Sequence, residues 1–102
     1  MISVIIPTFN EKNNISKILY KLLKIKNISE IIFVDDRSTD GTFKEIKKFF
    51  TYKKVRGFVR NSKFRDLSKS VLYGVKKSKN KIILVMDCDL QHNPKYIKKM
   101  EK

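Results

Sequence analysis

Residues 83–92 read ILVMDCDLQH: an apolar run passes directly into two aspartates that flank a cysteine. Such a short apolar run is typical of a strand that is buried on both faces of a parallel sheet. Asp87 and Asp89 follow at the end of this strand. Side chains two positions apart on a strand point the same way, so both carboxylates can face one ligand while Cys88 packs on the other side.

The same arrangement occurs twice earlier in the chain. Residues 2–7 and 31–34 are apolar runs, and each of them leads into a polar stretch. The polar residues of interest after these two runs are Thr8, Asn10, Glu11, Asp35 and Asp36. A weaker strand is expected at 54–59, and the run at 82–86 makes the fourth.

Segments with helical periodicity separate these strands. They cover residues 12–25, 42–50 and 67–77. Pro94 is expected to begin a final helix, because proline suits the first helical turn. The residues expected to face the core are Phe43, Ile46, Phe49 and Phe50 in the second helix, and Leu67, Val71, Leu72 and Val75 in the third.

This alternation predicts an α/β fold: a Rossmann-like, three-layer αβα arrangement with a mostly parallel sheet and right-handed crossovers. The chain has 102 residues and neither repeats nor a flexible linker, so residues 1–102 are expected to form one domain. In such sheets ligands bind beyond the carboxyl ends of the strands, where the strand order switches. The polar residues named above fall there, so we expect them to form one site.

The paired aspartates suggest a metal ion. Carboxylates as close as those of Asp87 and Asp89 repel each other, and a divalent cation removes that cost. Mg²⁺ or Mn²⁺ typically takes one or two carboxylates and completes its shell with phosphate oxygens and water. The alternative is a solvated loop that begins with acidic turn residues. No glycine-rich phosphate motif follows the first strand, so phosphates here would need a metal ion and cationic side chains.

Local structural roles compete with ligand binding in the earlier loops. Thr8 and Glu11 have the spacing of a capping box. Asp40 or Ser38 is expected to cap the helix that follows, with Gly41 supplying conformational freedom.

Lysine dominates the charge of the chain, whose formal net charge is +14. Such a surface attracts anionic membranes, nucleic acids or nucleotides. The lysines are scattered rather than clustered with arginine and aromatic residues, which favours a compositional bias over nucleic-acid binding. Arg60, Lys63 and Arg65 either face a diphosphate or form a solvated cluster. The single histidine, His92, is expected at the surface.

Cysteine usage and hydropathy indicate the compartment. Cys88 is the only cysteine, so no internal disulfide can form and a reducing, cytoplasmic compartment is expected. No secretion signal is recognisable, since polar residues follow the first apolar run too soon. No segment approaches the roughly 20 apolar residues of a membrane span.

Four ordered segments resemble the family 2 glycosyltransferases. The last two are most similar to the branch that contains the dolichol-phosphate and polyprenyl-phosphate sugar transferases. The resemblance covers nearly the whole chain and implies the N-terminal half of a GT-A fold, which binds a nucleotide sugar. The segments are VIIPTFNE (4–11), IIFVDDRSTDGT (31–42), FRDLSKSVLYGVKKSKNKIILVMD (64–87) and DCDLQHNP (87–94).

The resemblance also implies roles for individual residues. Asp35 or Asp36 would hold the base or ribose of the nucleotide. Asp87 and Asp89 would form the Asp-x-Asp motif that binds the metal ion and the diphosphate, and they are the candidate catalytic residues. Arg65 would approach the donor phosphates. The remaining positions implied to contact the nucleotide sugar are Pro7, Thr8, Asn10, Glu11 and Gln91.

The implied reaction moves a hexose from a nucleotide diphosphate sugar, GDP-mannose or a UDP-sugar, to a polyprenyl or dolichyl phosphate with Mg²⁺ or Mn²⁺. The acceptor phosphate is already ionised near neutral pH, so the reaction needs no general base. The implied protein is cytoplasmic and peripherally associated with the inner face of the membrane.

Two features depart from the pattern of the family. Where relatives usually read Arg-Gly-Leu-Ser, residues 65–68 read Arg-Asp-Leu-Ser, which puts bulk and negative charge near the donor phosphates. The chain also ends shortly after the Asp-x-Asp motif, where the acceptor-binding half follows in relatives, so a partner chain is expected to supply that half.

Three other functions stay open. A fragment could bind a nucleotide sugar without turnover. A receiver-like signalling domain also gathers aspartates at strand ends, but it needs an acidic pair after the first strand and a lysine after a fifth. A basic nucleic-acid-binding module is suggested by charge alone.

Overall fold

The computed structural model describes residues 1–88 and the backbone of residues 98–101. The four predicted strands and the first three predicted helices lie at the expected places, and the second strand is longer than predicted at both ends. In chain order the elements are β1 (Ile2–Thr8), the 3-10 turn η1 (Lys12–Asn14), α1 (Ile15–Leu23), β2 (Ile28–Asp35), α2 (Thr42–Lys47), β3 (Val55–Val59), α3 (Leu67–Lys77), β4 (Ile82–Val85) and β5 (Lys98–Glu101).

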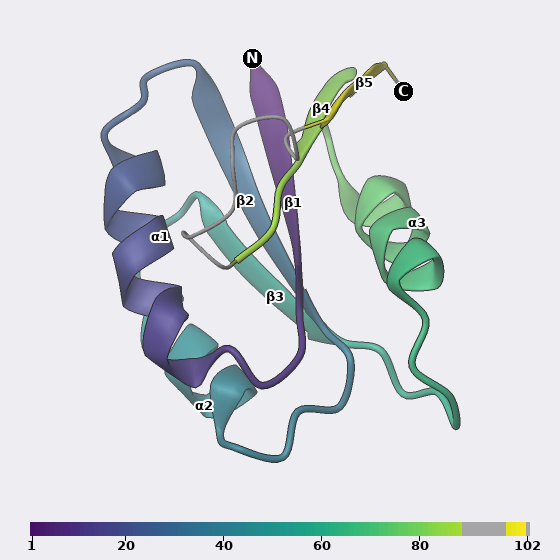
Figure 1. Ribbon diagram of the computed structural model, residues 1–102. Coiled ribbons are helices and arrows are strands. Elements are labelled where there is room, and N and C mark those ends of the chain that lie inside the picture. The colour runs from purple at the N-terminus through teal and green to yellow at the C-terminus, as the bar shows by residue number, and fades with distance from the viewer. Residues whose placement is uncertain (89–97, 102) are drawn as a thin grey trace.

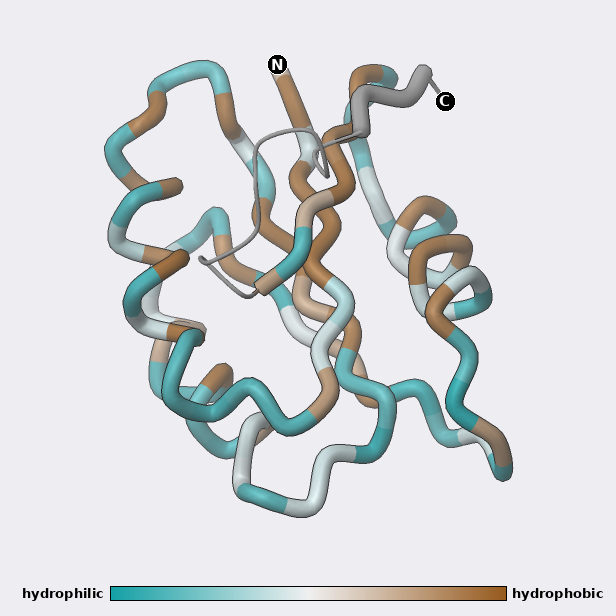
Figure 2. Tube along the Cα trace, viewed as in Figure 1, coloured by the Kyte–Doolittle hydropathy of each residue, from teal (hydrophilic) through white to brown (hydrophobic). Residues whose placement is uncertain are grey.

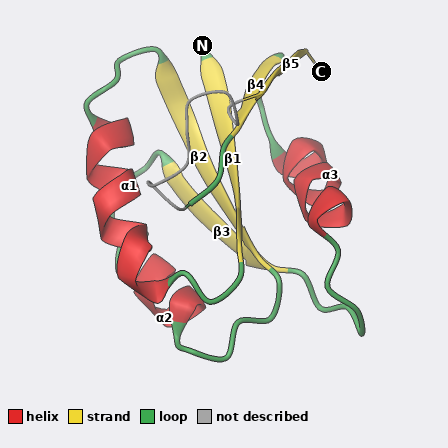
Figure 3. Cartoon of the chain, in the orientation of Figure 1, coloured by secondary structure: helices red, strands yellow, loops and turns green. Residues whose placement is uncertain are grey.

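The strands form one sheet in the order β3-β2-β1-β4-β5. All neighbouring pairs are parallel except β4 and β5, which are antiparallel. Helices α1 and α2 cover one face of the sheet and α3 covers the other (Figures 1 and 3). The three-layer α/β fold with a mostly parallel sheet is therefore confirmed. The strand order reverses between β1 and β4, which is where ligands bind in sheets of this kind.

The expectation of a helix that begins at Pro94 is wrong for the described residues. Lys98–Glu101 form β5, which pairs with β4 from Lys98 opposite Val85 to Glu101 opposite Ile82. Pro94 itself lies outside the described residues. β5 pairs with the edge of β4 that faces away from β1, whose backbone N–H and C=O groups would otherwise lack partners in the sheet. The hydrogen bonds formed by this long-range pairing outweigh a short local helix signal.

The larger part of the hydrophobic core lies between the sheet and helices α1 and α2. The apolar residues of α1 that recur at helical spacing are buried: Ile15, Ile18, Leu19 and Leu22. In the segment after it, α2 ends at Lys47 and Phe50 is exposed, contrary to prediction, whereas Ile46 and Phe49 are buried. Figure 2 shows the hydrophobic residues concentrated along the central strands.

Helix α3 faces the sheet with small residues rather than with its leucines. Ser70 and Gly74 are buried, whereas Leu67 and Leu72 are exposed, so the predicted inward face is wrong at both leucines. A Cβ atom at residue 74 would lie 2.5 Å from Ile5 Cγ2, so the helix approaches β1 too closely for a side chain there. Within the described residues, no helix has the length and apolar character needed to cross a bilayer.

A buried polar cluster around Glu30 ties together the strands near their amino ends. The Glu30 carboxylate accepts hydrogen bonds from Ser3 Oγ (2.8 Å), the backbone N–H of Lys79 (2.8 Å) and the Arg56 guanidinium (2.6 Å). Burial raises the pKa of Glu30, but these hydrogen bonds and the charge of Arg56 outweigh that effect and hold the pKa below its usual value of 4.5.

Replacing Glu30 with glutamine is expected to lower the free energy of unfolding by about 2 kcal/mol at neutral pH, because charge-assisted hydrogen bonds are lost. A depressed pKa stabilises the fold above the pKa of the unfolded chain, and this contribution disappears as the pH falls through the lower pKa of the folded state. The difference between wild type and Glu30→Gln should therefore shrink below about pH 4.5. Urea titrations across this range measure it. Glu45→Gln, which removes a carboxylate of α2 that pairs with Lys48, serves as the control, and a gap that stays constant on acidification would contradict the assignment.

Candidate functional site

A pocket of about 260 Å³ opens beyond the carboxyl ends of β1, β2 and β4. It lies at the switch in strand order, as the sequence predicts. Segments far apart in the chain contribute to it: the end of β1 and the loop after it, the loops after β2 and β4, and the entry into α3. Its lining residues are Pro7, Thr8, Phe9, Glu11, Asp36, Arg65, Leu67, Ser70 and Asp87.

The loops after β1 and β2 are joined by hydrogen bonds around Asn10. The backbone N–H of Asn10 donates to Ser38 Oγ at 2.8 Å, and its side-chain oxygen accepts from the backbone N–H of Thr39 at 2.9 Å. Asn10 has φ of 52°, in the left-handed region that asparagine tolerates better than most residues. Asn10 does not line the pocket. Its observed contacts hold the loop in place, and its implied contact with the nucleotide stays a prediction.

The expected capping box between Thr8 and Glu11 is not formed. The Thr8 hydroxyl donates to Asp35 Oδ1 at 2.8 Å, because parallel pairing sets these two residues side by side on β1 and β2. The Glu11 carboxylate instead accepts from Asn14 Nδ2 at 2.7 Å. Both Thr8 and Glu11 line the pocket, and their implied contact with the nucleotide stays a prediction.

The N-cap position of α2 is occupied by Gly41, so neither predicted cap, Asp40 or Ser38, lies there, although Asp40 bonds the first turn of the helix from the position before it. Asp40 Oδ1 accepts from the backbone N–H of Thr42 at 3.0 Å, and Oδ2 accepts from that of Lys12 at 3.3 Å. Slight burial raises the pKa of Asp40. The hydrogen bonds named above, together with the one from the Thr42 hydroxyl, lower the pKa by more than burial raises it, so the net shift is downward. Gly41 has φ of 89°, which fits the conformational freedom expected of it. Ser38 turns back toward the preceding strand instead.

The two aspartates that follow β2 have different environments. Asp35 is buried and accepts from Thr8 Oγ1, from Ser38 Oγ at 2.5 Å and from Ser38 N–H at 3.0 Å, so it braces the loop. Asp36 is also buried but lines the pocket. The structure therefore brings Asp36, and not Asp35, into the site with Asp87 and Arg65.

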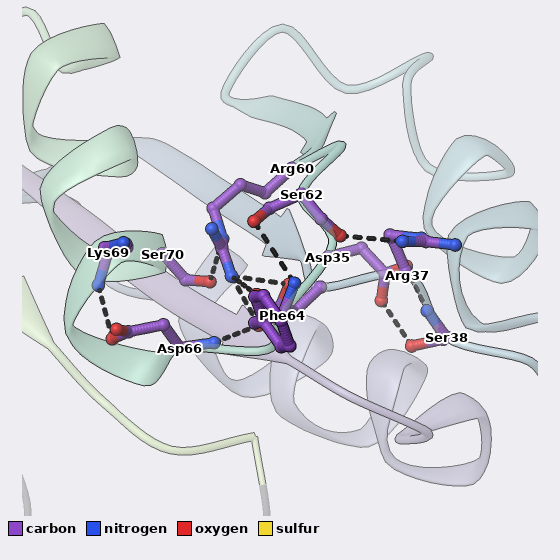
Figure 4. A network of polar contacts seen from close by, with 10 residues as sticks. Asp35, Arg37, Ser38, Arg60, Ser62, Phe64, Asp66, Lys69 and Ser70 are labelled. Atoms are coloured by element: carbon purple, nitrogen blue, oxygen red, sulfur yellow. Dashed lines mark hydrogen bonds and ion pairs between the residues drawn. The ribbon is translucent and has the colours of Figure 1, made fainter.

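Arg60 holds Asp36, a lining residue of the pocket, in place through an ion pair. Its guanidinium Nη2 lies 2.9 and 3.1 Å from the two Asp36 carboxylate oxygens, and both side chains are less than a tenth exposed. The same nitrogen donates to the Phe64 carbonyl at 2.7 Å, and Nε donates to Ser70 Oγ at 3.2 Å (Figure 4). Asp36 Oδ2 also accepts from the backbone N–H of Asp66 at 2.9 Å. The network thus fixes the loop that leads into α3.

Sequence reasoning grouped Arg60 with two exposed basic residues and missed this role. The signal exists only once the strand pairing is known. Asp35 on β2 lies opposite Val59 on β3, so the residue after each strand, Asp36 and Arg60, is brought next to the other.

Arg65 lies at the mouth of the pocket and stacks on an aromatic ring. Its guanidinium carbon is 3.6 Å from the centroid of the Phe9 ring, a cation–π geometry that orients a long side chain at low cost. The next residue, Asp66, departs from the family's glycine and caps α3: its carboxylate accepts from the backbone N–H of Lys69 at 3.1 Å. The bulk and charge of Asp66 therefore have a local structural use.

The predicted metal site lies only in part within the described residues. Asp87 is exposed and lines the pocket, and Cys88 is buried as predicted. Asp89, Gln91 and His92 lie outside the described residues. Among the described side chains, no three or more His, Cys, Asp or Glu converge as a metal cluster. A pocket with carboxylate and hydroxyl oxygens and a cation at its mouth fits a hard divalent ion that takes phosphate oxygens as its other ligands.

Comparison with known sequences identifies close relatives of this chain. It is 36% identical over 102 residues to a dolichol-phosphate mannosyltransferase of Pyrococcus furiosus, which covers 97% of this chain and 28% of that protein. It is also 36% identical over 104 residues to the dolichol-phosphate mannosyltransferase of Saccharomyces cerevisiae, with 96% and 39% covered. The chain thus spans well under half the length of these relatives.

Solved structures share the fold. The mannosyltransferase PcManGT from Pyrobaculum calidifontis, solved with GDP-Man and Mn²⁺, aligns with a TM-score of 0.74 at 22% identity over 86% of this chain and 27% of that one. The S. aureus protein TarS 1-349 aligns with a TM-score of 0.77 at 26% identity, again over 86% and 27%. The sequence model of glycosyl transferase family 2 matches residues 3–102. The chain belongs to this family, and its described fold is that of the N-terminal part of the GT-A enzymes.

Proposed function

We propose that the pocket binds a nucleotide diphosphate sugar, GDP-mannose or a UDP-sugar, and that the chain is the donor-binding part of a hexosyltransferase acting on a polyprenyl or dolichyl phosphate. One observation carries the proposal: a single pocket at the switch in strand order gathers Asp36, Arg65 and Asp87 from three separate segments. The mannosyltransferase relatives support the choice of donor and acceptor.

The described residues of the pocket contact different parts of the donor. Asp36, which Arg60 holds in place, accepts hydrogen bonds from the ribose or base. Arg65, stacked on Phe9, presents its guanidinium to the diphosphate. Thr8 and Glu11 complete the wall formed by the first loop. Because Asp35 is occupied by Thr8 and Ser38, the nucleotide contact is assigned to Asp36.

Asp87 and Asp89 are proposed to hold Mg²⁺ or Mn²⁺. A bound ion of this kind neutralises the charge that grows on the departing diphosphate. Asp87 reaches the pocket from the end of β4, on the same rim as Arg65. The acceptor phosphate is ionised near neutral pH, so the pocket does not have to supply a general base.

Calorimetric titration of the chain with GDP-mannose and with UDP-sugars tests the donor and metal assignments. Wild type should bind one of these donors in the presence of Mn²⁺, and EDTA should weaken that binding. Asp87→Ala and Asp89→Ala should each weaken Mn²⁺-dependent binding by at least about tenfold, as the loss of a metal ligand does. Glu45→Ala, an acidic residue of α2 that does not line the pocket, is the matched control.

Unchanged affinity in both aspartate variants would remove the metal assignment, and no donor binding by wild type would remove the donor site. Transfer is measured separately, with sugar donor and polyprenyl phosphate supplied with and without Mn²⁺. Binding without product would identify a chain that holds the donor but does not turn it over. Product formation would identify an active transferase.

A further inference from the structure

The wall of the pocket is acidic although the chain as a whole is strongly basic. Lysine and arginine together number 24, against 10 aspartates and glutamates. The charged residues that line the pocket are nevertheless mostly acidic: Glu11, Asp36, Asp87 and Arg65. The ion pair with Arg60 balances the charge of Asp36. The basic surface therefore attracts anions to the molecule, whereas the pocket itself opposes a ligand of high negative charge.

Asp66 adds a further carboxylate beside this wall. It stands between two lining residues, Arg65 and Leu67, and its backbone N–H donates to the carboxylate of Asp36 at 2.9 Å. Its carbonyl accepts from the backbone N–H of Ser70, another lining residue, at 3.0 Å. The side chain of Asp66 is half-buried and, among the residues that the structure describes, it belongs to no ion pair. A fixed negative charge thus lies at the edge of the pocket.

Helix α3 holds this carboxylate in place. Asp66 accepts from the backbone N–H of Lys69 at 3.1 Å, in the first turn of the helix (Figure 4). Backbone N–H groups at the start of a helix attract anions, and here a carboxylate of the chain satisfies one of them. A phosphate that approaches this end of α3 therefore meets the charge of Asp66 as well as the guanidinium of Arg65. Capping alone does not require that charge, because asparagine and serine cap helices about as well as aspartate.

Ligands that share a nucleoside diphosphate group differ in charge. In a nucleotide sugar each phosphate is linked on two sides and carries about one negative charge. The terminal phosphate of a free nucleoside diphosphate is a monoester and carries nearly two near neutral pH, and a nucleoside triphosphate carries about one charge more. A bound divalent cation lowers each total by two. The complex of the cation with the nucleotide sugar is then close to neutral, whereas the other two complexes stay negative.

We propose that Asp66 makes the pocket selective for a nucleotide sugar over the free nucleoside diphosphate that sugar transfer releases, and over nucleoside triphosphates. The charge of Asp66 hardly affects a neutral complex and repels the others in proportion to their charge. The proposal rests on the proposed function, which supplies the donor and the cation, and adds to it the ligands that the pocket excludes. As a consequence, the diphosphate product leaves readily and triphosphates compete poorly for the pocket.

Calorimetric titration in the presence of Mn²⁺ tests the proposal with three ligands of one base, the base being that of the donor bound by wild type. The ligands are the nucleotide sugar, the nucleoside diphosphate and the nucleoside triphosphate. Asp66→Asn keeps a helix cap and removes the charge. It should change the affinity for the nucleotide sugar by less than about twofold, and raise that for the diphosphate about threefold and that for the triphosphate about tenfold. Added salt should shrink these gains, because they are electrostatic.

Two further variants separate local charge from other effects. Asp66→Glu keeps the charge and should retain the discrimination of wild type among the three ligands. Glu45→Gln is the matched control: it also removes one negative charge, but from α2 and from a residue that does not line the pocket. It should leave all three affinities within about twofold of wild type. Circular dichroism checks the fold of each variant, and Asp66→Ser replaces Asp66→Asn if the latter does not fold.

Equal gains for all three ligands in Asp66→Asn would overturn the proposal, because they would reflect a change in the shape of the loop rather than in its charge. The same graded gains in Glu45→Gln would also overturn it, since the net charge of the chain would then be responsible. If wild type binds the nucleotide sugar and Asp66→Asn leaves the three affinities unchanged, only the role of Asp66 is removed. If wild type does not bind the nucleotide sugar, the proposed function is removed.

Discussion

Replacing Arg60 with methionine is expected to lower the free energy of unfolding by about 3–5 kcal/mol, because it leaves the Asp36 charge buried without its partner. Arg60 and Asp36 are each more than nine-tenths buried, and the guanidinium also holds the Phe64 carbonyl and the Ser70 hydroxyl. Asp36 keeps one other described donor, the backbone N–H of Asp66. A domain of this size has about 5–15 kcal/mol of stability in total, so the loss is a large share.

Urea denaturation followed by circular dichroism measures this loss. Lys63→Met, an exposed residue of the same loop, is the matched control and should stay within about 0.5 kcal/mol of wild type. Adding Asp36→Asn to Arg60→Met removes the stranded charge, so the double variant should recover part of the loss and give a coupling energy of about 1–3 kcal/mol. A strictly additive cycle would show that the ion pair does not contribute as a unit.

The same substitution should affect the pocket beyond its effect on folding. Arg60 fixes the Phe64 carbonyl, and Asp36 fixes the Asp66 N–H, so the two together set the backbone on both sides of Arg65. Arg60→Lys keeps a charge near Asp36 but cannot repeat the forked contacts. We therefore expect Arg60→Lys to lose less stability than Arg60→Met, and both to bind the donor more weakly than Lys63→Met under conditions where all three are folded.

The ends of the strands were predictable from the sequence, because the apolar pattern of each strand stops where polar and charged residues begin. Apolar runs at 2–7, 31–34 and 82–86 give way to polar residues, and parallel strands necessarily bring those ends to one edge. For this reason the sequence already indicates a shared site for Asp36 and Asp87. The sequence does not separate Asp35 from Asp36, because side-chain direction at the last residue of a strand depends on pairing: Thr8 lies beside Asp35 only in the observed register.

The details that sequence reasoning missed are all set by long-range packing. Nothing local shows that Arg60 will meet Asp36, since their contact follows from the pairing of β2 with β3. The inward face of α3 was mispredicted at Leu67 and Leu72 because leucine normally marks the buried side, whereas here closeness to β1 selects small residues. β5 was missed because its four residues form a strand only through their pairing with β4.

The close approach of α3 to the sheet gives the second large effect. Gly74→Leu is expected to lower the free energy of unfolding by about 3 kcal/mol, at the upper end of the cost of overpacking a well-packed core. A Cβ atom at residue 74 would lie 2.5 Å from Ile5 Cγ2 and 3.2 Å from Val34 Cγ2. Both neighbours are fully buried. Ile5 lies on the central strand β1 and its Cγ2 is bonded directly to its own Cβ, so neither neighbour can move aside at low cost.

Gly74→Ala separates this clash from helix propensity. Alanine favours a helix over glycine by about 1 kcal/mol. The overpacking that its Cβ causes costs about 1–3 kcal/mol, so we expect a net loss of about 1 kcal/mol despite the better helix former. Leu72→Ala on the exposed side of the same helix should change stability by less than about 0.5 kcal/mol. A rise in stability for Gly74→Ala in thermal or urea unfolding would contradict the close packing.

A compensating change in the strand makes the test specific. Ile5→Ala alone should cost about 2–5 kcal/mol, because it opens a cavity beneath α3. The same change in the Gly74→Leu background should cost at least about 1 kcal/mol less, because the introduced leucine occupies the space that Ile5 vacates. The two substitutions would then be coupled through one shared volume. That result would establish that the absence of a side chain at residue 74 lets α3 pack closely against β1. This close packing in turn positions Ser70, and through it Arg60, next to the pocket.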